Sequence, residues 1–348
     1  MKHFRISFLV TALCLAIAGW WGYRNAGIAG ALSALGVAVI LAVMEISLSF
    51  DNAVVNASVL KTWDDFWRKL FLGVGIIIAV FGMRLLFPLV IVAVAADIGL
   101  TEVWTLALNN PDEYSRHLTE HHAEVAAFGG IFLLMVFLNF VLDHEKETHW
   151  LGNFEKKLGS LGKISSISII VALGTLLGCM SLVGEGQKLA VLLSGLWGLL
   201  IYVGVDALSS YLEAGEEGDS GVGEMVKRGG IGGFLYLEVL DASFSFDGVI
   251  GAFAITKDVV IIMVGLAIGA MFVRSMTVYL VEKGTLDAYV YLEHGAHYAI
   301  GILAVIMLAS MKFHVPEIFT GLIGVAFIAA SVWSSLQYRK RQAALAMA

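Results

Sequence analysis

Two short segments place carboxylic acids inside otherwise apolar sequence. The first reads MEISLSFDN and contains Glu45 and Asp51, and the second reads LDASFSFDG and contains Asp241 and Asp247 in the same register. An acidic side chain at the depth of a lipid bilayer costs about 3 kcal/mol on insertion scales, so it marks a functional site by default. The chemistry open to such paired acids is the binding of cations or of protons.

The balance of charge within the apolar segments favours a doubly charged ligand. Glu238 adds a fifth acid, whereas the cations embedded at similar depth are Arg84 and Arg274. If every acid were ionised and both arginines were paired, three negative charges would remain. Protonation could neutralise some of the acids, or a divalent cation could occupy the site and leave one charge. The alternative is that the acids only fix helix packing through hydrogen bonds and salt bridges.

The side chains around the acids narrow the choice of ion. They are hard oxygen donors, namely Asn52, Asn56, Ser47, Ser49, Ser243 and Ser245. Neither motif contains a Cys, a pair of Met residues or a His cluster. Sites rich in oxygen suit Mg²⁺, Ca²⁺ and Mn²⁺ and disfavour Cu⁺ and, less strongly, Zn²⁺. The spacing alone does not choose among the first three ions.

Helix geometry separates the two acids of each motif. Residues six apart on an α-helix point about 240° away from each other and differ by about 9 Å in height. Glu45 and Asp51 therefore cannot touch one ion from a straight helix, and the same holds for Asp241 and Asp247. We expect the helices to be broken at SLSF and at SFSF, where backbone carbonyls freed by the break become further ligands. Serine hydroxyls can hydrogen-bond the freed backbone groups.

The composition assigns the elements that carry these acids to a membrane. Of 348 residues, 59% are hydrophobic and only 15% are charged, and the mean hydropathy is +0.84. Apolar runs of about 20 residues are typical of transmembrane helices and not of the alternating strands of a β-barrel. The predicted fold class is an all-α polytopic membrane protein. A net charge of −7 argues against nucleic acid as a partner, and Cys14 and Cys179 lie in apolar runs that predict buried thiols without a disulfide.

About ten transmembrane helices are expected. Their predicted ranges are 4–22, 27–59, 70–96, 123–142, 164–184, 189–210, 230–256, 259–281, 288–310 and 317–337. The first range resembles a signal peptide, but GWWGYR has no small residues placed for cleavage, so we expect a retained helix. Arg84 and Pro88 could divide the third range into a crossing and a re-entrant piece, which leaves the number of crossings in residues 70–108 open.

The chain contains an inverted repeat of three helices. EHHAEVAAFGGIFLLM, which begins at Glu120, aligns with EHGAHYAIGILAVIML, which begins at Glu293, and Arg84 corresponds to Arg274. The two acidic-motif helices are expected to lie an odd number of crossings apart, which gives them opposite orientations and predicts a site near the midplane between the halves. The expected units are residues 1–26 (N-terminal extra helix), 27–142 (first repeat), 143–229 (connecting helices and cytoplasmic loops), 230–310 (second repeat) and 311–348 (C-terminal helix and basic tail).

Lysine and arginine predict the orientation. With the N-terminus inside, fifteen of these residues fall in inside loops and five in outside loops, which satisfies the positive-inside rule. The expected location is the cytoplasmic (inner) membrane, with both termini in the cytoplasm. The 97–122 loop then faces outward, as a solvated loop or as an electronegative vestibule for cations. Glu124 and His297 occupy matching repeat positions near the two surfaces, where they are either interfacial residues or parts of a gate or proton relay.

The paired motifs resemble a known family. EISLSFDNAVVNA and EVLDASFSFDGVIGAF are similar to the signatures of TerC-like integral membrane proteins, of which this chain looks like a longer branch, and the resemblance covers about residues 45–285. That family belongs with the LysE-like transporter superfamily, and the resemblance implies a divalent-metal path, manganese export and homeostasis, and a link to tellurite resistance. By position it implies a site made of Glu45, Asp51, Asn52, Glu238, Asp241 and Asp247. The sequence departs from the pattern at Gly248, where relatives often have Ser.

Together these observations lead to one principal hypothesis. We expect a secondary transporter that moves Mn²⁺ or a similar hard divalent cation (Ca²⁺ or Mg²⁺) outward by alternating access, with proton antiport. Arg84 and Arg274 would neutralise the acids in the ion-free state. The alternative is a non-transporting membrane scaffold or metal sensor, whose basic loops and 211–229 segment recruit cytoplasmic partners. An enzyme is not expected, because neither an HExxH zinc motif nor a serine nucleophile motif occurs. Lipid, metal ions and further copies of the chain are the expected partners.

Overall fold

The computed structural model is a bundle of helices. It describes residues 2–75, 77–96, 98–144, 146–164, 166–213, 230–283, 289–313 and 315–346. No strand occurs among these residues, and seven of their helical segments are long and apolar enough to cross a membrane. The predicted fold class, an all-α polytopic membrane protein, is confirmed.

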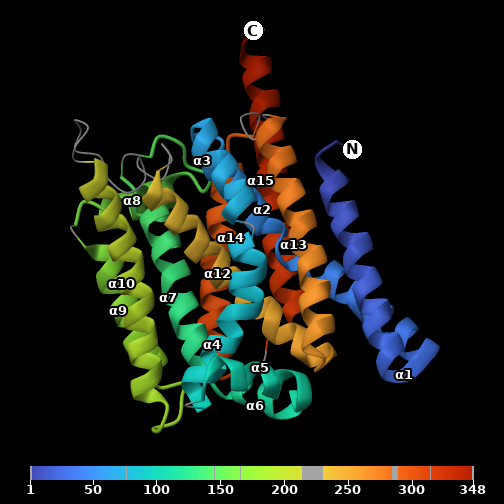
Figure 1. Cartoon of the computed structure of the whole chain (residues 1–348). Coiled ribbons are helices and arrows are strands. Elements are labelled where there is room, and N and C mark those ends of the chain that lie inside the picture. Colours follow the sequence, from blue (N-terminus) through green and yellow to red (C-terminus); the bar gives the residue numbers. More distant parts are fainter. Residues whose placement is uncertain are drawn as a thin grey trace.

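The long helices stand side by side and leave both chain ends at the same end of the bundle (Figure 1). They are α1 (Arg5–Leu48), α2 (Phe50–Leu60), α7 (His122–Val141), α9 (Ile167–Cys179), α10 (Lys188–Glu213), α12 (Ile231–Ile255), α13 (Val259–Glu282), α14 (Leu292–Ser310) and α15 (Glu317–Ala346). A shorter helix, α8 (Asn153–Leu161), lies between α7 and α9. Most ranges predicted to cross the membrane fall on one of these helices each. The range 4–22 is the first part of α1, 27–59 covers the rest of α1 and α2, and 70–96 is built from several pieces.

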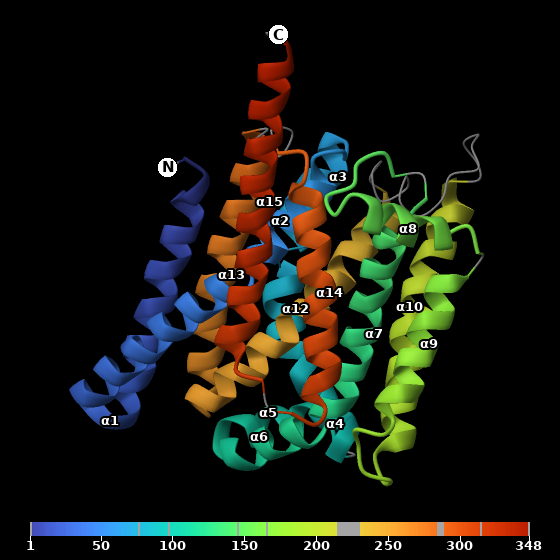
Figure 2. The ribbon, with the colours of Figure 1, turned by 180° about the vertical axis from the view of Figure 1, so that it is seen from behind.

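α1 is a helical hairpin (Figure 2). Its backbone leaves helical geometry at Ala26 and at Gly27, whose φ of 61° lies in the left-handed region that glycine adopts readily. The two arms pack closely, because a methyl group at Gly22 would lie 2.6 Å from the Cβ of Ala34. Small residues on facing surfaces let helices approach each other in a membrane. The first predicted span is one arm of this hairpin, and the second predicted span comprises the other arm together with α2.

The first acidic motif interrupts its helix and the second does not. α1 ends at Leu48, Ser49 has non-helical backbone angles (φ −99°, ψ 16°), and α2 starts at the next residue. α12 continues as a helix through the SFSF segment. The predicted helix break is therefore present at SLSF, and the prediction of a break at SFSF is wrong. Ser47 and Ser243, which are in register, each donate Oγ to the carbonyl four residues earlier, Val43 O and Val239 O (both 2.9 Å). The next pair differs, because Ser49 Oγ donates to the side chain of Glu45 (2.9 Å) whereas Ser245 Oγ has no partner among the described residues.

Within the described residues, the segment 65–96 forms one helical crossing. It comprises α3 (Asp65–Leu70), the π-helical segments η2 (Phe71–Gly75) and η3 (Ile78–Leu86), and α4 (Phe87–Ala96). π-Helical turns are wider than α-helical turns and occur frequently at functional sites. Arg84 lies in η3, and Pro88, which has no N–H to donate, follows near the start of α4. Two short helices, α5 (Leu100–Asn109) and α6 (Pro111–Glu120), then lie across the end of the bundle opposite the two termini (Figure 1).

The two acidic-motif helices run in opposite directions. In Figure 1, α2 rises toward the end of the bundle that holds both termini, whereas α12 descends from that end. The same opposition relates η3 to α13 and α7 to α14. Across the two halves, α1 and α2 pack on α13, α12 packs on η3, and α7 packs on α14. An inverted repeat requires such directions and contacts, and the exact boundaries of the predicted units stay a prediction.

Candidate functional site

A small polar cavity lies inside the bundle where α2, η2 and η3 meet α12 and α13. Its volume is about 40 Å³, whereas a single water molecule needs about 10–15 Å³. The polar side chains that line it are Asn52, Asn56, Arg84, Asp241, Arg274 and Thr277. The remaining wall is apolar and includes Val80 and Val273. The cavity therefore gathers polar residues from both halves of the chain at one place in the interior.

Glu45 and Arg84 form a buried ion pair next to this cavity. Arg84 Nη2 contacts Glu45 Oε1, and the side chains are 7% and 1% exposed, respectively. Arg84 Nη1 also donates to Ala79 O (2.8 Å), and Ser49 Oγ donates to Glu45 Oε1 (2.9 Å). Because both side chains are removed from solvent, each charge depends on the other for its stabilisation.

Two glycines make room for Glu45. A methyl group at Gly248 of α12 would lie 2.8 Å from Glu45 Oε2, and one at Gly269 of α13 would lie 2.5 Å from Glu45 Cγ. Contacts this short force a shift of side chain or backbone, so a larger residue at either position would displace the acid. The glycine at position 248 thus has a local reason, since α12 leaves the space that a side chain from α1 occupies.

Asn56 connects Asp241 to the first half of the chain. Its Nδ2 donates to Asp241 Oδ1 (2.8 Å), which joins α2 to α12. Asn52 and Asn56 are 5% and 4% exposed, and the amide oxygen of each has no hydrogen-bond donor among the described residues. Buried acceptors without a donor are uncommon in folded proteins, and an unseen ion or water is one physical explanation for them.

Arg274 approaches the cavity from the second half. Its Nε donates to Leu72 O (2.7 Å), which ties α13 to η2. Thr277 lies nearly one turn further along α13, lines the same cavity, and donates its hydroxyl to Val273 O (3.1 Å). The two arginines at matching repeat positions therefore line one cavity. Arg84 forms an ion pair there, whereas the hydrogen bond described for Arg274 is to a backbone carbonyl.

Two of the predicted acids face other helices. Asp51 is 6% exposed, its Oδ1 accepts from Asn52 N (2.9 Å), and a methyl group at Gly324 of α15 would lie 2.7 Å from its Oδ2. Glu238 is 5% exposed and packs directly against Gly75 of η2. Neither of its oxygens has a hydrogen-bond partner in the part of the chain that the structure describes. Neither acid lines the cavity.

The side chain of Asp247 lies outside the described residues. Its backbone belongs to α12, and a meeting of its carboxylate with that of Asp51 stays a prediction. Within the described ranges, no group of three or more His, Cys, Asp or Glu side chains is close enough to hold a metal ion. A cation in this cavity would therefore be held by Asp241 together with amide oxygens, or by acids that the arginines have released.

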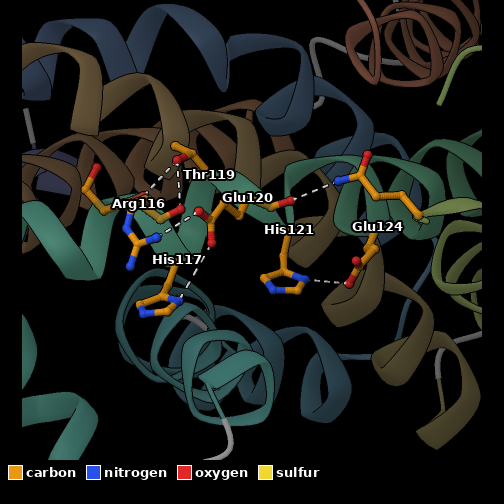
Figure 3. A network of polar contacts seen from close by, with 8 residues as sticks. Arg116, His117, Thr119, Glu120, His121 and Glu124 are labelled. Carbon is orange, nitrogen blue, oxygen red and sulfur yellow. Dashed lines mark hydrogen bonds and ion pairs between the residues drawn. The ribbon is translucent and has the colours of Figure 1, made fainter. Parts of the chain in front are cut away.

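Glu124 and His297 lie near the starts of α7 and α14, which run in opposite directions (Figure 1). Figure 3 shows Glu124 beside His121, whose Nδ1 lies 2.9 Å from Glu124 Oε2. The His297 ring instead stacks on Phe140, with the ring centroids 3.9 Å apart. Neither side chain lines the cavity, so a role in a gate or proton relay stays a prediction.

Sequence reasoning leaves two cavity residues out of the predicted site. The sequence predicts Asn56 only as an oxygen donor near the acids, and Thr277 is not among the predicted residues. Asn56 follows Asn52 by four residues, and Thr277 follows Arg274 by three. Residues three or four apart are neighbours on one face of a helix. A search for polar residues at helical spacing from each predicted site residue would have found both.

Comparison with known proteins identifies one family. No curated protein and no solved structure matches the chain. A family model described as "Protein of unknown function (DUF475)" matches residues 50–342, which include α2 and nearly all of the chain that follows. The comparisons do not test the resemblance to TerC-like proteins. Because the match covers most of its length, the chain belongs to the DUF475 family of proteins of unknown function.

Proposed function

We propose that this protein is a secondary transporter of hard divalent cations, with Mn²⁺ as the favoured substrate and Ca²⁺ or Mg²⁺ as alternatives. The observation that carries the proposal is a polar cavity between the helices in which Asp241 lies beside two amide oxygens without donors among the described residues. Carboxylate and amide oxygens are ligands that suit all three ions. A buried site between two inverted halves is also where secondary transporters bind their substrates.

The ion pair between Glu45 and Arg84 is the arrangement that we expect of the carrier when no cation is bound. With Arg84 on Glu45, this acid is neutralised, and an empty carrier can reorient with one uncompensated acid fewer in its apolar interior. A bound cation would take over this neutralising role from the guanidinium. Proton antiport follows from the same reasoning, because acids that lose a metal ion without gaining an arginine need another positive charge.

Location and direction belong to the same proposal. Both termini lie at one end of the bundle (Figure 1), and the positive-inside rule assigns that end to the cytoplasm. We therefore propose a multi-pass protein of the cytoplasmic (inner) membrane. Export as the direction, manganese homeostasis as the role and any link to tellurite resistance rest on the resemblance to TerC-like proteins alone.

A second candidate function is a non-transporting membrane scaffold or metal sensor. It is favoured by α15, which extends beyond the other helices at the end that holds both termini (Figure 2). Arg339, Lys340 and Arg341 are exposed on this extension, where positive charge could attract acidic partners. The 211–229 segment expected to dock such partners lies mostly outside the described residues.

Flux measurements in proteoliposomes test the carrier. Wild type would be compared with Asp241→Asn, with Glu45→Gln and with the control Glu185→Gln, which removes an acid that is 89% exposed. A Mn²⁺-sensitive dye inside the vesicles reports transport. We expect wild type and control to transport at equal rates and the two site variants to be slower by about tenfold or more, as for the loss of groups that hold a metal site in place.

Asp51→Asn and Asp247→Asn extend the same comparison to the two acids whose convergence is predicted. Wild-type vesicles that pass none of Mn²⁺, Ca²⁺ and Mg²⁺ would argue for the scaffold, provided that the protein still binds cytoplasmic partners. Equal flux in wild type and in all four acid variants would remove the site assignment.

A further inference from the structure

Asn56 is a buried polar residue on the cavity face of α2. It follows Asn52 by four residues, so the two amides lie about one turn apart on the same face of the helix. Its side chain is 4% exposed and lines the cavity together with that of Asn52. The residue in register with it in the second acidic-motif helix is Ala252, so the second half offers no matching amide.

The hydrogen bond to Asp241 determines which way the Asn56 amide points. Asp241 Oδ1 lies 2.8 Å from Asn56 Nδ2. An ionised carboxylate only accepts hydrogen bonds, so the amide nitrogen faces it and the amide oxygen occupies the other branch of the planar group. That oxygen has no donor among the described residues, and the oxygen of Asn52 has none either.

The cavity thus combines one carboxylate with two unsatisfied neutral oxygens. A water molecule would satisfy the two amide oxygens by donating to them. A hard cation would satisfy the same oxygens and would also neutralise the charge of Asp241, which water does not do. A volume of about 40 Å³ gives room for either.

We propose that Asn56 is a specificity-determining ligand of the transported cation, an inference that rests on the proposed function. Its amide oxygen joins that of Asn52 and the carboxylate of Asp241, and its amide nitrogen holds Asp241 at the site. A ligand set made only of oxygen atoms takes hard divalent cations and disfavours soft ones such as Cd²⁺. Because Asn56 and Asp241 belong to different halves, a movement of α2 away from α12 takes the set apart and releases the ion.

Titration of the purified full-length protein with MnCl₂ tests this inference. Asn56→Leu keeps the size of the side chain but removes its oxygen and nitrogen, whereas Asn56→Asp keeps the size and an oxygen ligand. The matched control is Asn139→Leu, because Asn139 of α7 donates to Tyr202 OH (2.8 Å) away from the cavity. We expect Asn56→Leu to weaken Mn²⁺ binding by about 10–100-fold. Both Asn56 variants lack the amide nitrogen that holds Asp241, so the difference between them reports the oxygen ligand. Asn56→Asp should bind Mn²⁺ more tightly than Asn56→Leu, since a carboxylate is a ligand for hard cations, and Asn139→Leu should bind as wild type does.

Two results would overturn the inference while leaving the proposed function in place. One is wild-type affinity in Asn56→Leu, and the other is an equal loss of affinity in Asn56→Asp and Asn56→Leu, since the oxygen at this position is then not a ligand. A wild-type protein that binds none of Mn²⁺, Ca²⁺ and Mg²⁺ overturns the proposed function and the inference together. If Asn56→Leu does not elute as a single species in gel filtration, Asn56→Ala, which also lacks the oxygen and the nitrogen, replaces it with the same expected loss.

Discussion

Removing either member of the Glu45–Arg84 pair is expected to destabilise the protein strongly. The two side chains are 1% and 7% exposed. Glu45→Gln therefore leaves a guanidinium without its partner, and Arg84→Met leaves a carboxylate without one. Breaking a buried ion pair by removing one partner costs about 3–5 kcal/mol, because the remaining charge stays buried and uncompensated.

The two single variants are expected to differ in cost. The carboxyl left alone in Arg84→Met can take up a proton and become neutral, whereas the guanidinium in Glu45→Gln stays charged. Glu45→Gln should therefore fall at the upper end of the range of about 3–5 kcal/mol and Arg84→Met at the lower end. The double variant removes both charges, and replacing a whole buried pair is often neutral, so we expect it to recover most of the loss. With single costs of about 5 and about 3 kcal/mol and a double variant that loses at most about 2 kcal/mol, the coupling energy between the two positions should be about 6 kcal/mol or more.

Unfolding free energies measured by SDS titration in mixed micelles supply the four corners of this double-mutant cycle. The matched control is the surface pair of Lys188 and Glu185, 2.5 Å apart with side chains 33% and 89% exposed. Glu185→Gln is expected to cost less than about 1 kcal/mol, as exposed pairs do. A Glu45→Gln variant no less stable than this control, or a coupling energy below about 1 kcal/mol, would refute the reasoning.

Three further predictions concern single positions. Burial raises the pKa of Glu155, but the hydrogen bond and the charge of Lys146, whose Nζ lies 2.5 Å from Glu155 Oε1, lower this pKa by more than burial raises it. The pKa of Glu155 therefore lies below its ordinary value of 4.5. Its stabilisation is therefore fully present above pH 4.5 and is lost as the pH falls through the lower folded value. Glu155→Gln should remove about 3–5 kcal/mol and flatten the decline of the unfolding midpoint in acid, and a decline parallel to wild type would contradict this. Gly248→Ala should displace Glu45 and cost about 1–3 kcal/mol, and wild-type stability in SDS titration would rule out the close contact. Gly27→Ala should cost about 1–3 kcal/mol through backbone strain alone, because its φ of 61° with ψ of −149° is a combination that only glycine adopts readily and nothing lies within 4 Å of the added methyl group; a larger loss in the same titration would point to a steric clash.

The helices and their directions could be predicted from the sequence, but which acid each arginine contacts could not. A long apolar run in hydrocarbon has to satisfy its own backbone hydrogen bonds, so each such run becomes a helix. The register between the two halves also indicates that Arg84 and Arg274 occupy matching places, and both do line one cavity. That Glu45 meets Arg84 depends on how η3 crosses α1, and spacing along the chain carries no information on such a crossing.

The two serine-rich segments illustrate the limit of local sequence. SLSF and SFSF differ by one residue in four, yet the helix breaks at Ser49 and continues through the matching Ser245. Whether a helix breaks depends on what stabilises the freed groups and on what the serine hydroxyl binds, and these are tertiary contacts. The position of Asp51 against Gly324 was equally beyond sequence reasoning, because α15 lies outside both repeats.

The two halves of the bundle contribute unlike parts to the cavity. The first half supplies the amides of Asn52 and Asn56, and the residues in register with them in the second half are Gly248 and Ala252. The second half supplies Asp241, Arg274 and Thr277 instead. In a carrier built this way, the neutral ligands travel with α2 and the charged ligand travels with α12. The ion is then held tightly while the halves are together and weakly when they separate. Such a difference in affinity between two conformations is what allows one site to take up an ion on one side and release it on the other.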